Sequence, residues 1–362
     1  MAGVWRKDYE ELADRDLGGD VARFSLPGGR NWHLRARNVM ISESRVRLAR
    51  HVVALGAISG AVLGIWLGLV IGEARASGEE MATSYMAGKS RIDVRIDAGS
   101  MQVSNQELME WVHWASDSVS RYFGRFPVPE VSLHIIPVEG RGVRGGKTFG
   151  ESQGGSIRIH VGEEITMPGL KDDWMLTHEM VHLGFPSVEE DHHWIEEGLA
   201  TYVEPIARVR AGHLDAHEMW FELVRDLHQG LPQSGDEGLD HTHTWARTYW
   251  GGALFCFLAD VEIREKTQNR KGLEDALRGI LNAGGDIRQD WELTKALEVG
   301  DKATGVAVLL PLYNKMKDKP YDVDLAAMWT KLGVIRNADT VQFDDKAPLA
   351  KVRDAITFGT SH

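Results

Sequence analysis

The chain has 362 residues, of which 43% are apolar and 26% are charged, a composition that suits a globular protein with a sizeable core. Its formal net charge of −12 excludes a general nucleic-acid binder, because binding to phosphates requires a basic surface. Cys256 is the single cysteine, so disulfide bonds within the chain and cysteine-rich zinc sites are excluded too.

Residues 52–72 form an uncharged apolar run that is long enough to span a bilayer. Residues 1–51 before it show no sustained apolar period and are predicted to form a loosely ordered tail. Arginines outnumber acidic residues just before the run, and glutamates outnumber arginines just after it. The positive-inside rule therefore predicts a single-pass membrane anchor with a cytoplasmic N-terminus, and it places everything from about residue 75 onward in the periplasm or the extracellular space.

The apolar run permits two further interpretations. Translation from Met40 would turn it into a signal peptide with a small-x-small cleavage site that ends at Ala76, and the protein would then be secreted. Glycine also recurs every fourth residue, which predicts a face for self-association, although glycine is common in membrane helices in any case. These glycines are Gly56, Gly60, Gly64, Gly68 and Gly72.

Residues 73–90 are predicted to be a polar linker, and residues 91–165 a small α/β subdomain. Ile92, Val94 and Ile96 alternate with polar neighbours, as on a half-buried strand. Ser104 and Glu107 form a capping-box pattern ahead of an amphipathic helix that stops at Gly124. Two further strands are predicted at 131–138 and 156–161, with a glycine-rich stretch between them.

From Asp173 onward the pattern is mostly helical, which predicts a helical subdomain over 166–350 and a C-terminal tail over 351–362. The fold class is therefore α+β, with a small mixed sheet followed by a mainly helical half. Residues 140–145 match the glycine pattern of dinucleotide-binding loops, but a strand follows where such a loop must open into a helix. Nucleotide binding is rejected for this reason.

The segment His178-Glu179-Met180-Val181-His182 carries the H-E-x-x-H pattern of zinc hydrolases. On a helix the two histidines project from one face, one turn apart, and can share a metal ion. Glu179 lies beside them and can take a proton from a water at the metal. The alternative interpretation is a surface helix that carries two histidines and a glutamate by chance.

A third ligand is suggested by residues 194–204, Trp-Ile-Glu-Glu-Gly-Leu-Ala-Thr-Tyr-Val-Glu. This segment resembles the second zinc helix of gluzincin peptidases of the MA clan, in which W-x-x-E-G-x-x-x-Y supplies a glutamate ligand. The resemblance implies a zinc metallopeptidase with a thermolysin-like catalytic domain, with Zn²⁺ bound by His178, His182 and Glu197. Glu196 and the neighbouring histidines His192 and His193 are weaker rivals for the third ligand position.

The segment Tyr249-Trp250-Gly251-Gly252 resembles the Y-x-x-G segment of gluzincins, and the match continues through residues 258–267 and 273–278. This stretch is similar to the glycyl aminopeptidase-type branch, although the chain has no room for the N-terminal β domain and the PDZ domain usual there. The resemblance implies that the Tyr249 hydroxyl donates to the developing oxyanion. Judged from the residues alone, Tyr249 is equally compatible with a packed aromatic side chain.

The resemblance also implies a glutamate before the metal helix that binds the free amine of a substrate. Glu151 stands near that position, but the motif around it is degenerate. Aminopeptidase and endopeptidase activity are therefore both open, and the predicted strand that begins at Ser156, just after Glu151, is an alternative binding site for an extended peptide. The alternative from another functional class is a membrane-tethered protein of the same fold that binds peptides without cleaving them.

Overall fold

The structure is a computed structural model, and it describes residues 80–359. No helix within this range is both long and apolar enough to cross a membrane. The predicted tail, the apolar run 52–72 and its five glycines lie outside the described residues. The membrane anchor and the self-association therefore stay predictions.

A five-stranded mixed sheet begins the described part. Its strands are β1 (Met81–Ala87), β2 (Ser90–Ile96), β3 (Glu130–Val138), β4 (Val143–Glu151) and β5 (Gly154–Gly162). They lie in the order β1-β2-β3-β5-β4. The two inner pairs, β2 with β3 and β3 with β5, are parallel, whereas β1 and β4 pair antiparallel with their neighbours. Strand β4 is thus an edge strand of the sheet, and it precedes its neighbour β5 in a hairpin.

Helix α2 (Asn105–Phe123) has the capping box predicted from the sequence. The Ser104 hydroxyl accepts the backbone N–H of Glu107, while the Glu107 carboxylate accepts the N–H of Ser104. Gly124 ends the helix with a φ of 77°, a left-handed conformation that glycine adopts without strain. Both ends of this helix were correctly predicted from local signals.

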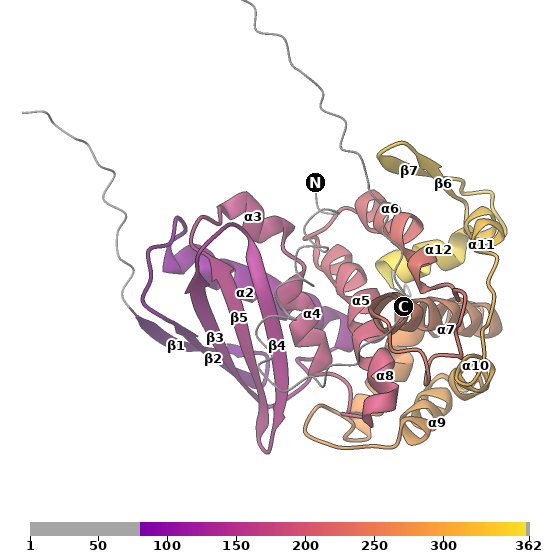
Figure 1. Ribbon diagram of the computed structural model, residues 1–362, viewed down its shortest axis with the longest axis horizontal. Helices are drawn as coiled ribbons and strands as arrows, with labels where there is room; N and C mark the ends of the chain where they lie inside the picture. The colour runs from indigo at the N-terminus through magenta and orange to yellow at the C-terminus, as the bar shows by residue number, and fades with distance from the viewer. Residues whose placement is uncertain (1–79, 360–362) are drawn as a thin grey trace, which may run out of the picture. The chain divides into compact units, whose positions relative to one another are not determined.

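The remaining elements form the helical half, which lies beside β4 with helix α4 between it and the sheet (Figure 1). These elements are α3 (Met167–Asp172), α4 (Met175–His182), η1 (Glu190–His192), α5 (His193–Ala211), α6 (Ala216–Asp226), η2 (Leu227–Gly230), η3 (Arg247–Gly251), α7 (Gly252–Thr267), α8 (Leu273–Asn282), α9 (Leu293–Thr304), α10 (Leu309–Met316), α11 (Leu325–Leu332), the two-stranded β6 (Val334–Asn337) and β7 (Thr340–Phe343), and α12 (Ala350–Phe358). The prediction of a small mixed sheet followed by a helical half is confirmed.

Three segments differ from their predicted structure. The predicted linker 73–90 contains β1, whose side chains are mostly exposed and show no alternation of apolar residues. The glycine-rich stretch between the predicted strands is β4, which has too few large side chains to show a strand pattern. The predicted tail 351–362 contains α12, whose inner face is buried.

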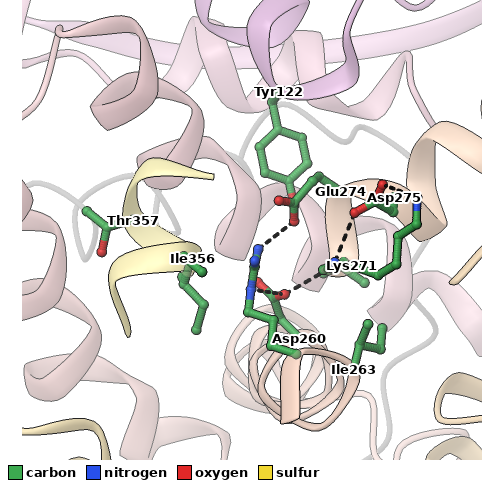
Figure 2. Close-up of polar contacts among 12 residues, drawn as sticks. Tyr122, Asp260, Ile263, Lys271, Glu274, Asp275, Ile356 and Thr357 are labelled. Carbon is green, nitrogen blue, oxygen red and sulfur yellow. Dashed lines mark hydrogen bonds and ion pairs between the residues drawn. The ribbon is translucent and has the colours of Figure 1, made fainter. Parts of the chain in front are cut away.

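Charged side chains inside the helical half form a buried cluster between α5, α7 and α8. Arg264 Nε lies 2.8 Å from Asp260 Oδ1, and Arg264 Nη2 donates to Glu274 Oε2 at 2.6 Å (Figure 2). The Tyr202 hydroxyl donates to Asp260, and Arg210 donates to Glu274. Arg264 is fully buried, so its charge is compensated only by these carboxylates.

Removing the central cation of this cluster should destabilise the fold. Arg264→Met leaves two buried carboxylates without their main partner, so the free energy of unfolding should fall by about 3–5 kcal/mol. Lys266→Met on the same helix is the control, because it removes an exposed ion pair with Glu262 and should change stability by about 1 kcal/mol or less. Chemical denaturation of the full-length chain measures both, and an equal loss for the two variants would contradict the role of Arg264.

Candidate metal centre

Helix α4 carries His178 and His182 on one face. Asp173 starts this helix, because its carboxylate accepts the backbone N–H groups of Met175 and Leu176 at 3.2 and 3.1 Å. The helix is buried on nearly every side, so its position is fixed by packing. The two imidazole rings meet edge to face, with 4.9 Å between their centroids.

Helix α5 brings Glu197 to these rings. Glu197 Oε2 lies 3.1 Å from His178 Nε2 and 3.7 Å from His182 Nε2. One donor atom from each of the three residues lies within 4.8 Å of the other two. Among residues 80–359, these three side chains are the group of possible metal ligands that come this close together. Two imidazoles and one carboxylate are the ligands of many catalytic zinc sites, in which a fourth position stays open, so the residues present fit zinc.

The electrostatics of the three side chains also suit a metal ion. Burial lowers the pKa of His182 to about 4, so its imidazole is neutral, which is the form that binds metals. Burial alone would raise the pKa of the Glu197 carboxyl, but the neighbouring His182, His178 and His193 hold it well below its usual value. Glu197 is therefore ionised at neutral pH, which is the form in which a carboxylate binds a metal ion.

Glu179 lies on the side of α4 that faces strand β4. The Thr148 hydroxyl on that strand lies 2.6 Å from Glu179 Oε2 and 2.9 Å from the Glu179 backbone oxygen. A β-carbon at Gly146 would lie 2.6 Å from Glu179 Cγ, so only glycine leaves room for this carboxylate. Desolvation by burial raises the pKa of Glu179 to about 7, which suits a group that must take up and release a proton near neutral pH.

Tyr249 comes from the π-helical turn η3, which immediately precedes α7. Its ring is nearly parallel to the His178 ring, with 6.3 Å between centroids and 18° between planes. Trp245 stacks on Tyr249 at 5.5 Å. The structure thus places the Tyr249 ring beside His178, and the role of its hydroxyl at the oxyanion stays a prediction.

Two glycines set the distance between η3 and α5. A β-carbon on Gly198 would lie 2.2 Å from the Gly252 backbone, and one on Gly252 would lie 2.0 Å from the Trp194 carbonyl oxygen. Gly198 directly follows Glu197, and Gly252 is three residues after Tyr249. The glycines of the two sequence motifs are therefore in contact with each other, and this contact brings their functional residues together.

Glu151 lies apart from this group. It is the last residue of β4, it is exposed, and it pairs with Gly154 across the hairpin. Successive side chains on a strand point to opposite faces, so Glu151 is on the face opposite to Thr148 and Gly146, which contact Glu179. Its predicted role in binding a substrate amine stays a prediction.

From the sequence, His193 and Glu196 were only rivals for the ligand position, and Thr148 had no predicted part in the metal site. In the structure His193 lies between Glu196 and Glu197, and these hydrogen bonds raise its pKa to about 10. His192 lies 3.1 Å from the Tyr313 hydroxyl. The spacing of His193, Glu196 and Glu197 on one helix was visible in the sequence, whereas the contact of Thr148 with Glu179 depends on tertiary packing.

Comparisons with known proteins agree with this fold. The sequence matches no protein-family model, and a sequence comparison with curated proteins gives no match. Solved structures of similar fold include an aminopeptidase N family protein from Idiomarina loihiensis, with a TM-score of 0.51 and 11% identity over 71% of this chain. A weaker match is an M1 zinc metallopeptidase from Deinococcus radiodurans, with a TM-score of 0.44 and 15% identity over 68% of this chain, which is too low to support a shared fold. The chain spans about half the length of each, 50% and 53% respectively.

The contact between the two glycines can be tested by adding one methyl group. Gly198→Ala places a β-carbon into the Gly252 backbone, so the free energy of unfolding should fall by about 1–3 kcal/mol through overpacking. Gly169→Ala in α3 is the control, because its nearest neighbour is 3.3 Å away and alanine favours helix formation. Denaturation curves of both full-length variants measure the difference. A stability of Gly198→Ala equal to that of the control would contradict the tight packing of α5 against Gly252.

Proposed function

We propose that the chain is a zinc-dependent peptidase that hydrolyses peptide bonds by general-base catalysis. The observation that carries this proposal is the buried group of His178, His182 and Glu197, whose donor atoms lie within 4.8 Å of one another beside the Glu179 carboxylate. A fold shared with an aminopeptidase N family protein supports the same class of activity.

His178, His182 and Glu197 would hold Zn²⁺. When bound there, the ion would polarise the scissile carbonyl and lower the pKa of a water. Glu179 takes the proton from the attacking water and returns it to the nitrogen of the leaving amine. The Thr148 hydroxyl orients the Glu179 carboxylate during both transfers.

Tyr249 is proposed to stabilise the oxyanion of the tetrahedral intermediate. Its ring lies nearly parallel to the His178 ring at 6.3 Å between centroids, which places the side chain next to the metal-binding group. A neutral phenol donates a hydrogen bond to a developing negative charge, and in a site with little water this bond is stronger than in bulk solvent. The nearly parallel Trp245 ring restricts the orientation of Tyr249.

The substrate is proposed to bind as an extended peptide along β4. Among residues 80–359 this strand has a sheet partner on one side only, β5, and its residues Gly146 and Thr148 contact the proposed catalytic carboxylate. A peptide that adds to the free edge of β4 would therefore pass the Glu179 carboxylate. The apolar run 52–72 favours a location of this domain outside the cytoplasm, a proposal that rests on the sequence alone.

Glu179→Gln separates hydrolysis from metal binding. The variant keeps the shape of the site and all three ligands but has no base, so the turnover of a peptide library should fall by about 10²–10⁴-fold while bound zinc stays unchanged. Zinc content and cleavage are measured on the full-length chain in mild detergent. The control is Glu190→Gln, an exposed glutamate near the start of α5, which should cleave like the wild type.

Three outcomes of this experiment are distinct. Zinc binding with Glu179-dependent cleavage supports the peptidase. Zinc binding without any cleavage by the wild type supports the peptide-binding protein of the same fold. A wild type that binds no zinc contradicts both the metal site and the proposed mechanism.

Glu151→Gln tests whether the enzyme recognises a free amine through this residue. Because Glu151 points away from the strand face that contacts Glu179, we expect the ratio of cleavage rates for free and N-acetylated peptides to equal that of the wild type. Steady-state kinetics with matched pairs of peptides measure this ratio. A loss of preference for free peptides in the variant would instead establish Glu151 as the amine site.

A further inference from the structure

The Glu197 carboxylate has a second oxygen that does not face the metal-binding histidines. Glu197 Oε2 is the atom near His178 and His182, whereas Oε1 lies 3.3 Å from His193 Nε2. The other ring nitrogen, His193 Nδ1, lies 2.9 Å from Glu196 Oε2. The three side chains therefore form a continuous chain of hydrogen bonds that ends on the third ligand.

The far end of this chain is attached to the backbone. Glu196 Oε1 accepts the N–H of Val188 at 3.3 Å. Val188 belongs to the loop that connects α4, which carries the two histidine ligands, with α5, which carries the glutamate ligand. The hydrogen bonds thus link the loop after His182 to the carboxylate of Glu197.

We propose that His193 and Glu196 are positioning residues of the metal centre, which hold Glu197 by one oxygen so that only the other is presented to the metal. The proposal rests on the zinc site described above. It explains why the start of α5 carries a histidine three residues before one glutamate and four before the next, since residues at these spacings lie on one face of a helix.

His193 acts as a donor and not as a ligand. Both of its nitrogens face carboxylate oxygens, which accept hydrogen bonds only, so both nitrogens carry protons and neither has a lone pair for a metal. His193 does not belong to the metal-binding group. Among residues 80–359, that group consists of His178, His182 and Glu197, whose donor atoms lie within 4.8 Å of one another.

Glu196 has two effects in this arrangement. It fixes the ring of His193, and its negative charge offsets the positive imidazolium that would otherwise repel a metal cation nearby. Outer residues that orient a ligand commonly change metal affinity by about 10–100-fold. The same effect is expected here, because a Glu197 side chain released from His193 must be ordered again each time a metal binds.

The double variant His193→Phe/Glu196→Gln tests the proposal. It removes one positive and one negative charge, so the net charge around the metal is preserved and only the orientation of Glu197 is lost. The dissociation constant for zinc, measured on the full-length chain in mild detergent by competition with a chromophoric chelator, should rise by about 10–100-fold. The thermal midpoint of the metal-free variant should equal that of the metal-free wild type, because these side chains are 44% and 23% exposed.

The control is His241→Phe/Asp318→Asn, which removes an exposed histidine–aspartate pair of similar geometry, 3.2 Å apart, and should leave zinc affinity unchanged. If the zinc dissociation constant of the double variant lies within about threefold of the wild-type value, the positioning role of His193 and Glu196 is overturned, whereas the zinc site itself is not. A fall in the metal-free midpoint with unchanged affinity also overturns it, because the role would then be structural. A wild type that binds no zinc removes the proposed function and this inference together.

Discussion

The close backbone contact between Gly198 and Gly252 is the constraint on which the site depends. Neither residue has a side chain, so α5 and the start of α7 approach until their backbones touch. Glu197 precedes one glycine and Tyr249 lies one turn before the other. The relative position of Glu197 and Tyr249 is therefore set by two helical backbones, and packing of this kind holds side chains in place more closely than a flexible loop does.

Two carboxylates in this site have pKa values shifted in opposite directions. Burial raises the pKa of Glu179 to about 7, whereas the histidines around Glu197 outweigh its burial and hold its pKa well below the usual value. A carboxyl that is half protonated near neutrality can exchange a proton, and one that is always ionised can bind a cation. The same type of side chain is thus suited to act as a base in one environment and as a metal ligand in the other.

The sequence predicted the parts of this molecule that depend on short spacings. Both ends of α2 and the placement of His178 and His182 on one helix face follow from residues close in sequence, whereas Glu197, which lies on another helix, was predicted only through the resemblance to gluzincin peptidases. Strand β1 and helix α12 were missed because an exposed edge strand and a short terminal helix leave weak periodicity. Strand β4 was missed because its glycines, among them Gly146, are required by neighbours that are distant in sequence. The contact of Thr148 with Glu179 could not be predicted for the same reason, because the two residues are distant in sequence.

The contact between β4 and Glu179 couples the strand proposed to bind the substrate to the proposed catalytic base. Gly146 leaves the space into which the carboxylate fits, and Thr148 donates a hydrogen bond to it, which partly offsets the cost of burying the charge. Any displacement of β4 would change both the space and the hydrogen bond. A peptide bound along this strand would therefore lie next to the carboxylate and also restrict the strand that holds it, so substrate binding and orientation of the base would depend on the same few residues.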